Sequence, residues 1–147
     1  MIDELDRKIL RLLQKDARLS YREIAKELNI AVGTVHNRIK RMEENGVLKA
    51  FYPKVDYEKI GYGLTAIIGI QAQGKKIVEI EKQIAKDSHV MCVYDVTGDY
   101  DIIIVAKFRN REDMNRFVKS VLAIDGVEKT TTHVAMQIVK EEFTLEP

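Results

Sequence analysis

Apolar residues in the first 46 positions repeat at helical spacing in three short stretches. They fall at i, i+4, i+7 and i+8 in residues 5–13, at i, i+3, i+4 and i+7 in residues 21–28, and at i, i+4 and i+7 in residues 35–42. This spacing is typical of amphipathic α-helices that each bury one stripe. We therefore expect three short helices around one small core, the third within residues 32–46.

Polar residues typical of helix ends mark the boundaries of these stretches. Asp3 is placed to cap the first helix, and Ser20 with Glu23 forms a capping-box pattern at the second. Gly46 follows the third stretch, where a glycine commonly ends a helix. Only residues 29–31 separate the second helix from the third. Two short helices with so short a joint predict a helix-turn-helix.

Beyond residue 63 the apolar pattern changes to the alternation of β-strands. Residues 64–73 alternate, residues 90–97 and 101–108 are apolar on both faces, and a long strand is predicted from residue 127 to about residue 143. Helical spacing returns in residues 75–86 and after Asn110, which is placed to cap the last helix. The order βαββαβ is typical of a ferredoxin-like domain.

These elements predict an α+β protein with two domains. We expect an N-terminal three-helix, winged-helix-like helix-turn-helix domain in residues 1–50 and a C-terminal ferredoxin-like βαββαβ domain in residues 64–147. Residues 47–56 are predicted to form an extended strand that Pro53 confines to an edge, and residues 51–63 would form the linker.

The second face of the predicted sheet has nothing to cover it. Two helices can cover one face of four strands, and alternation leaves apolar side chains on the other, namely Met91, Val93, Ile103 and Val105. An exposed apolar face of that size is typical of an association site. We therefore expect a homodimer or a larger homo-oligomer.

Composition and charge narrow the class of protein. Residues 1–52 hold 11 Lys and Arg against 8 Asp and Glu, whereas residues 53–147 hold 13 against 15. A polyanion would thus bind the N-terminal part of the chain, residues 1–52. The single Cys92 excludes an intrachain disulfide, and no apolar run is long enough to span a membrane. We expect a cytoplasmic protein.

The third helix has the side chains that a DNA-binding helix needs. Arg38, Lys40 and Arg41 make it basic, and no acid precedes Glu43. Asn pairs with adenine and Arg with guanine in the major groove, while Lys and Arg also hold phosphates. A solvated surface helix is the alternative, but the two helices before it favour DNA binding. The candidate DNA-binding residues are Tyr21, Arg22, Gly33, Thr34, His36, Asn37, Arg38, Lys40 and Arg41.

Three of these residues have other interpretations. Arg38 lies beside the buried apolar stripe of the third helix and could pair with an acid of the first or second helix. Tyr21 could belong to the core, and Gly33 could merely avoid a clash.

The order of motifs resembles the Lrp/AsnC family of feast/famine transcriptional regulators. The similarity covers the N-terminal L-D-R-K-I-L-R-L-L-Q-K-D-A-R, the turn A-K-E-L-N-I, the helix T-V-H-N-R-I-K-R-M-E-E-N-G-V-L and the later G-D-Y-D. The resemblance implies a C-terminal domain that dimerises, dimers that assemble into rings, often octamers, and an amino acid or similar effector between dimers. Ala31 departs from the pattern, because many relatives have a capping Ser or Thr there.

The turn Gly98-Asp99-Tyr100-Asp101 has two interpretations. As structure, Gly and Asp suit a tight hairpin turn, and Tyr100 would pack over it. As function, its amides and carboxylates could hold the charged groups of an amino acid, and the resemblance implies that effectors bind at this turn. Thr131, Thr132 and His133 of the last strand could come to the same site from a neighbouring dimer.

Enzyme chemistry is not indicated. His89 and Cys92 have the only metal-like spacing but lack a second pair of ligands, so we expect no metal, no cofactor and no catalytic residues.

We expect a sequence-specific transcriptional regulator, a repressor or autoregulator, which binds double-stranded DNA and possesses an amino-acid effector site. One alternative is an architectural, nucleoid-like protein that wraps DNA with little sequence preference. Another is an effector-binding or catalytic domain whose N-terminal helices mediate contacts with other proteins.

Overall fold

The computed structural model describes residues 1–147, which form two compact units. The first unit contains Met1–Lys54 together with Lys140–Pro147, and the second contains Val55–Val139. No helix is long and apolar enough to cross a membrane.

Three helices build the first unit, namely α1 (Glu4–Lys15), α2 (Tyr21–Leu28) and α3 (Val32–Glu44). The predicted caps are confirmed: Asp3 forms a capping box with Asp6 at α1, and Ser20 forms one with Glu23 at α2. A turn with Asn29 in the left-handed conformation joins α2 to α3. The predicted helix-turn-helix is therefore present.

The core of the first unit is the set of apolar stripes seen in the sequence. Its buried members are Ile9, Leu13, Ile24, Ala25, Val35, Ile39 and Met42. Ile30, in the turn, packs against this cluster. All three helices contribute side chains to this core. The orientation of α3 within the unit therefore depends on α1 as well as on α2.

The C-terminal residues belong to this first unit. Glu146 pairs with Arg11 of α1, and Glu142 pairs with Lys54. The Phe143 and Leu145 side chains between them are exposed. The tail is thus held in place largely by charge, because its apolar side chains are not buried.

Four strands form the sheet of the second unit, in the order β2-β3-β1-β4, with every neighbouring pair antiparallel. The strands are β1 (Leu64–Ala72), β2 (Val90–Asp95), β3 (Ile102–Phe108) and β4 (Val127–Val134). Ile68 of the central strand lies opposite Ile104 on one side and Thr132 on the other.

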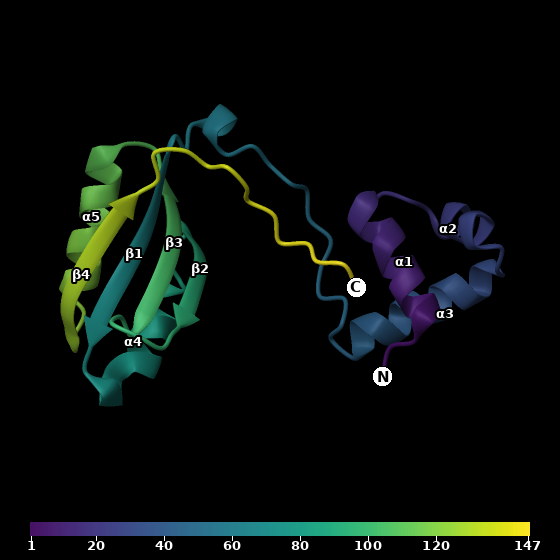
Figure 1. Ribbon diagram of the computed structural model, residues 1–147, viewed down its shortest axis with the longest axis horizontal. Coiled ribbons are helices and arrows are strands. Elements are labelled where there is room, and N and C mark those ends of the chain that lie inside the picture. Colours follow the sequence, from purple (N-terminus) through teal and green to yellow (C-terminus); the bar gives the residue numbers. More distant parts are fainter. The chain divides into compact units, whose positions relative to one another are not determined.

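Two α-helices, α4 (Ile77–Ile84) and α5 (Arg111–Leu122), cover one face of this sheet (Figure 1). Their buried side chains pack on the core face of the strands, and the cluster includes Ile80, Ile84, Phe117 and Val121. Two short 3-10 helices, η1 (Glu58–Ile60) and η2 (Gly74–Lys76), precede β1 and α4. The βαββαβ arrangement is confirmed.

Two strand predictions are wrong. Residues 47–56 form no strand, because Pro53 lacks an N–H donor and no strand within the chain pairs with this segment. β4 ends at Val134 rather than near residue 143. Val134 lies opposite Ala66, and β1 begins only two residues earlier, so the partner strand ends there.

A third difference is a β-bulge in β2. The register of β2 against β3 shifts between Val90 and Cys92, so Val93 lies opposite Ile104 and packs in the core. The prediction that Val93 is on the uncovered face is therefore wrong. Cys92 and Tyr94 take that face instead, opposite Val105 and Ile103.

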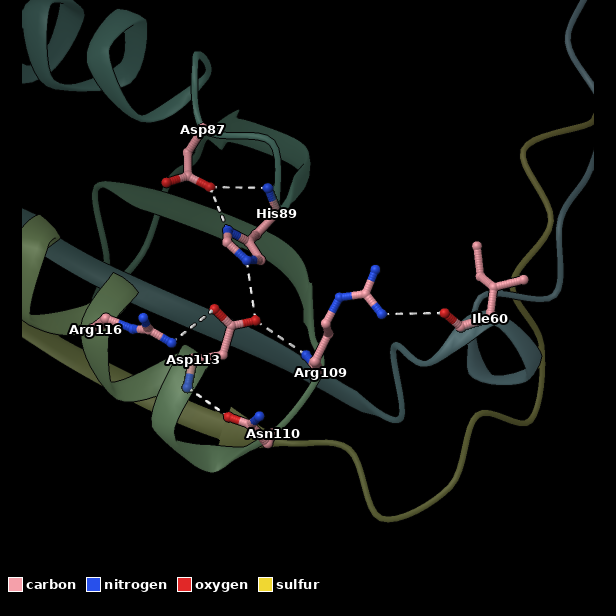
Figure 2. A network of polar contacts seen from close by, with 7 residues as sticks. All are labelled: Ile60, Asp87, His89, Arg109, Asn110, Asp113 and Arg116. Carbon is pink, nitrogen blue, oxygen red and sulfur yellow. Dashed lines mark hydrogen bonds and ion pairs between the residues drawn. The ribbon is translucent and has the colours of Figure 1, made fainter.

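A polar network joins the segment before β2, the start of α5 and η1 (Figure 2). The His89 ring lies between Asp87 and Asp113, at 2.8 Å from Nδ1 and 3.1 Å from Nε2. Asp113 also accepts the backbone N–H of Arg109, whose guanidinium donates to the carbonyl of Ile60 in η1. The 3-10 helix η1 is thereby bonded to Arg109, which directly precedes the N-cap of α5.

Candidate nucleic-acid interface and effector turn

The exposed side of α3 brings together most of the predicted DNA-binding residues. Val35, Ile39 and Met42 point into the core. Five candidates on the same helix are exposed, namely Gly33, His36, Asn37, Lys40 and Arg41. Thr34 and Arg38 are half-buried at the edges of this surface.

The beginning of α3 offers backbone N–H groups to a ligand. Ala31 is the N-cap and its side chain makes no capping bond, as the sequence predicts. A Cβ atom added to Gly33 would meet nothing within 4 Å. The absence of a side chain at Gly33 therefore relieves no clash within the chain, and it leaves the backbone open at the point where α3 begins.

The start of α2 adjoins the middle of α3. The rings of Tyr21 and His36 meet edge to face, with centroids 5.6 Å apart. Tyr21 is 38% exposed, so it is not a core residue, and the neighbouring Arg22 is exposed as well. The structure thus brings Tyr21 of α2 against His36 of α3.

Arg38 and Arg41 bind acids of α1. Arg38 pairs with Asp3 and, at 3.3 Å, with Asp6, while Arg41 pairs with Asp6 at 2.6 Å. The interpretation of Arg38 as a partner of a first-helix acid is confirmed. The Arg38 guanidinium, with the N–H of Asp6, lowers the pKa of Asp3 to about 2. Lys40 makes only a 3.9 Å contact with Glu44, one turn away on α3.

Asp6 is the functional candidate that sequence reasoning missed. It is 0% exposed although it is ionisable. The helical spacing of the sequence could have identified it, because Asp6 lies three residues before Ile9 and seven before Leu13, within the buried stripe of α1. A carboxylate in such a stripe indicates a cationic partner from another element.

The turn at residues 98–101 is folded onto β1. Gly98 has φ +105°, which a residue with a side chain rarely adopts. The Asp101 carboxylate accepts the N–H of Ala72 at 2.8 Å, and the carbonyl of Asp99 accepts from the side-chain amide of Gln71 at 2.9 Å. These bonds support the structural interpretation of the turn and leave the Asp99 carboxylate exposed.

Tyr100 lies over Gly69 of β1 rather than over its own turn. A Cβ atom at Gly69 would be 2.7 Å from the Tyr100 ring, so only glycine leaves room for this ring. Gly69 lies opposite Thr131 of β4, which brings Thr131 beside Tyr100 on the uncovered face.

The three β4 candidates do not share one face. Thr131 and His133 lie opposite Gly69 and Ile67 on the uncovered face, whereas Thr132 lies opposite Ile68, whose side chain is in the core. Thr132 therefore points to the helix-covered side, away from Thr131 and His133.

A basic, exposed helix in a helix-turn-helix unit, joined to a separate βαββαβ unit, defines a DNA-binding regulator with an additional regulatory domain. Family models agree: residues 2–49 match the winged helix-turn-helix DNA-binding model, and residues 65–145 match the Lrp/AsnC ligand binding domain. The chain belongs to the Lrp/AsnC family of transcriptional regulators.

Individual relatives span the whole chain. It is 71% identical over 147 residues to an uncharacterized HTH-type transcriptional regulator of Pyrococcus abyssi, covering 100% of both chains. It is 38% identical over 145 residues to the HTH-type transcriptional regulator FL11 of Pyrococcus furiosus, covering 99% of this chain and 96% of FL11. Among solved structures, AsnC of E. coli superimposes with a TM-score of 0.91 at 28% identity, covering 100% of this chain and 99% of AsnC.

Proposed function

We propose that this Lrp/AsnC-type regulator recognises a specific double-stranded DNA site with the exposed side of α3 and acts as a repressor or autoregulator. The main support is the exposure of Asn37, His36 and Lys40 on the face of α3 opposite its buried stripe. Asn37 suits adenine readout, and Lys40 suits phosphate.

The entry of α3 supports a phosphate contact. The first-turn amides have no side-chain cap at Ala31, and Gly33 leaves them accessible. A helix N-terminus attracts anions through its free N–H groups and its dipole. In this proposal a DNA phosphate takes the place that a Ser or Thr side chain would otherwise fill.

The uncovered sheet face supports a homodimer. Ile103 and Val105 are half-buried there, and Tyr94 is exposed. A dimer with two-fold symmetry would present two copies of α3 to a near-palindromic site, with half-sites about 34 Å apart or a multiple of that distance. Further assembly of dimers into octamers is part of the proposal.

An amino acid is the proposed effector, bound near the turn at residues 98–101. The exposed Asp99 carboxylate suits an ammonium group, and the next residue, Tyr100, lies with Thr131 on the uncovered face. Such a ligand regulates DNA binding only if its affinity differs between two states of assembly. No catalytic residue or cofactor is part of the proposal, and the protein would act in the cytoplasm.

Selection of bound sequences from a library of random duplexes tests the proposal, with and without each of the twenty amino acids and in large excess of non-specific DNA. We expect one enriched, near-palindromic motif whose yield changes with at least one amino acid. Asn37→Ala should relax the motif at one base pair, because a bidentate base contact discriminates by about 1–3 kcal/mol.

Lys75→Ala serves as the matched control, because it removes an exposed cation from η2 and should leave the motif unchanged. Retention of DNA without an enriched motif would favour the architectural, DNA-wrapping alternative. No retained DNA at all would contradict both interpretations.

A further inference from the structure

Asp6 is a buried carboxylate beneath the DNA-binding helix. Its Oδ2 atom accepts the N–H of Asp3 at 2.9 Å and an Arg41 N–H at 2.6 Å, and its Oδ1 atom lies 3.3 Å from Arg38. A buried charge is tolerated when it is paired and hydrogen-bonded. Asp6 meets this condition through the N–H of Asp3 and through two guanidinium groups, so that both of its ion pairs are with arginines of α3.

The two arginines use Asp6 differently. Arg38 is 26% exposed, and one of its nitrogens contacts both Asp3 and Asp6. Its guanidinium is therefore bound to the acids at the start of α1. Arg41 is 45% exposed, and one of its terminal nitrogens contacts Asp6. A guanidinium has five N–H donors in a rigid plane. One edge of Arg41 is therefore fixed, and donors remain for a second anion.

The fixed guanidinium lies beside the residues proposed to read bases. Arg41 follows Asn37 by four positions on α3, which places the two side chains as neighbours on the helix surface. An arginine and a phosphate form short, charge-assisted hydrogen bonds, often in a bidentate geometry. The distance from Arg41 to a phosphate thus depends on the angle at which Asp6 holds its guanidinium.

We propose that Asp6 is a positioning residue for DNA binding, which orients Arg41 so that its free N–H groups meet a DNA phosphate. Free arginine side chains lose rotamer freedom when they bind, and a side chain that is already ordered avoids that cost. This inference rests on the proposed function of α3. It adds that a buried acid, which cannot touch DNA, contributes to affinity through Arg41.

A double-mutant cycle in DNA affinity tests the inference, with full-length wild type, Asp6→Asn, Arg41→Ala and the double variant titrated over a series of salt concentrations. Arg41→Ala should lower the slope of log K against log salt by about one, the value for one phosphate contact. Asp6→Asn should keep the slope and weaken binding about threefold to tenfold, the range for ordering one long side chain. In the Arg41→Ala background, Asp6→Asn should then have no further effect.

Lys40→Ala supplies the matched control cycle. Lys40 is a cation on the same helix without a contact to Asp6, so its effect and that of Asp6→Asn should be additive. A purely structural role for Asp6 predicts a different pattern: Asp6→Asn would lower the unfolding temperature, leave the affinity of the folded protein unchanged and show no coupling to Arg41.

Arg41→Lys keeps the inference testable if Asp6→Asn does not fold. The lysine retains the charge, and hence the salt slope, but lacks the rigid fork that spans two anions. It should bind DNA about threefold to tenfold more weakly, and an affinity equal to wild type would overturn the inference.

Loss of slope in Arg41→Ala without coupling to Asp6 refutes only the role of Asp6. If Arg41→Ala and Lys40→Ala both bind as wild type, the proposed function of α3 is wrong.

Discussion

Glu81, on α4, is a single side chain that opposes folding at neutral pH. Its Oε1 atom is buried without a hydrogen-bond partner. Burial, followed by the nearby carboxylate of Asp95, raises the pKa of Glu81 above its usual 4.5. A raised pKa means that the folded state holds the proton more tightly than the unfolded state does. The resulting stabilisation is present below pH 4.5 and is lost as the pH rises through the raised value.

Glu81→Gln should therefore stabilise the protein at pH 7. The amide N–H can donate to Asp95 at any pH, and a buried acceptor without a partner costs about 1–3 kcal/mol. We expect a rise in unfolding temperature of about 2–4 °C at pH 7, which corresponds to about 1 kcal/mol in a protein of this size. The rise should shrink toward pH 4, where Glu81 is protonated.

Thermal denaturation followed by circular dichroism between pH 4 and pH 7 measures this effect. Glu79→Gln is the control, because Glu79 is exposed on the same helix and should change the unfolding temperature little at either pH. An equal shift at both pH values would show that the charge of Glu81 is not the cause.

At the scale of elements, Asp113 joins three parts of the second unit. It belongs to the first turn of α5 and accepts hydrogen bonds from the backbone of Arg109 and from His89. Both ring nitrogens of His89 face carboxylates, so only the doubly protonated ring donates to Asp87 and Asp113 together. The N–H of Arg109, and then the charge of His89, lower the pKa of Asp113.

Asp113→Asn should lower the free energy of unfolding at pH 7 by about 1–2 kcal/mol, because hydrogen bonds to a charged group are replaced by weaker neutral ones. A depressed carboxyl pKa stabilises the fold above its unfolded value of 3.8, and this stabilisation is lost as the pH falls through the lowered value. The difference between wild type and variant should therefore vanish in strong acid.

Urea denaturation from pH 7 down to about pH 2.5 tests this dependence through the midpoint at constant slope. Glu112→Gln is the matched control, since Glu112 is an exposed acid in the same first turn of α5. If Glu112→Gln and Asp113→Asn had the same effect, the helix dipole rather than the network would be responsible.

The elements themselves were largely predictable from the sequence, because their signals are local. The caps at Asp3, Ser20 and Asn110 act within four residues and formed as expected. The bulge that moves Val93 into the core was not predictable, because register depends on the partner strand. The same holds for the site: the exposed residues of α3 followed from periodicity, whereas the pairing of Arg41 with Asp6 required the packing of α1.

For the whole molecule, the uncovered face of the sheet is the feature with the largest consequence. Ile103 and Val105 of β3 lie there between Cys92 and Tyr94 on one side and Ile67 and Gly69 on the other. The side chains at the centre of this face are thus apolar, and α4 and α5 pack on the opposite face of the sheet. Burial of such a face between two copies would stabilise a dimer in proportion to its apolar area.

Ile103→Lys should therefore convert the oligomer to monomers at micromolar concentration, because each interface would bury two lysine charges. Size-exclusion chromatography with light scattering measures the mass. Val78→Lys, on the exposed side of α4, introduces the same charge away from the sheet and should leave the dimer intact. Wild-type protein that runs as a monomer would contradict this account of the sheet face.

The return of residues 140–147 to the first unit makes the second unit an insertion within the first. The polypeptide connects the two units twice, once through the linker and once through the segment after β4. The second connection ends in the exposed ion pairs of Glu142 and Glu146, which dissolved salt weakens. We therefore expect high salt to release residues 140–147 from the first unit, and a fusion tag at either terminus to extend from the first unit.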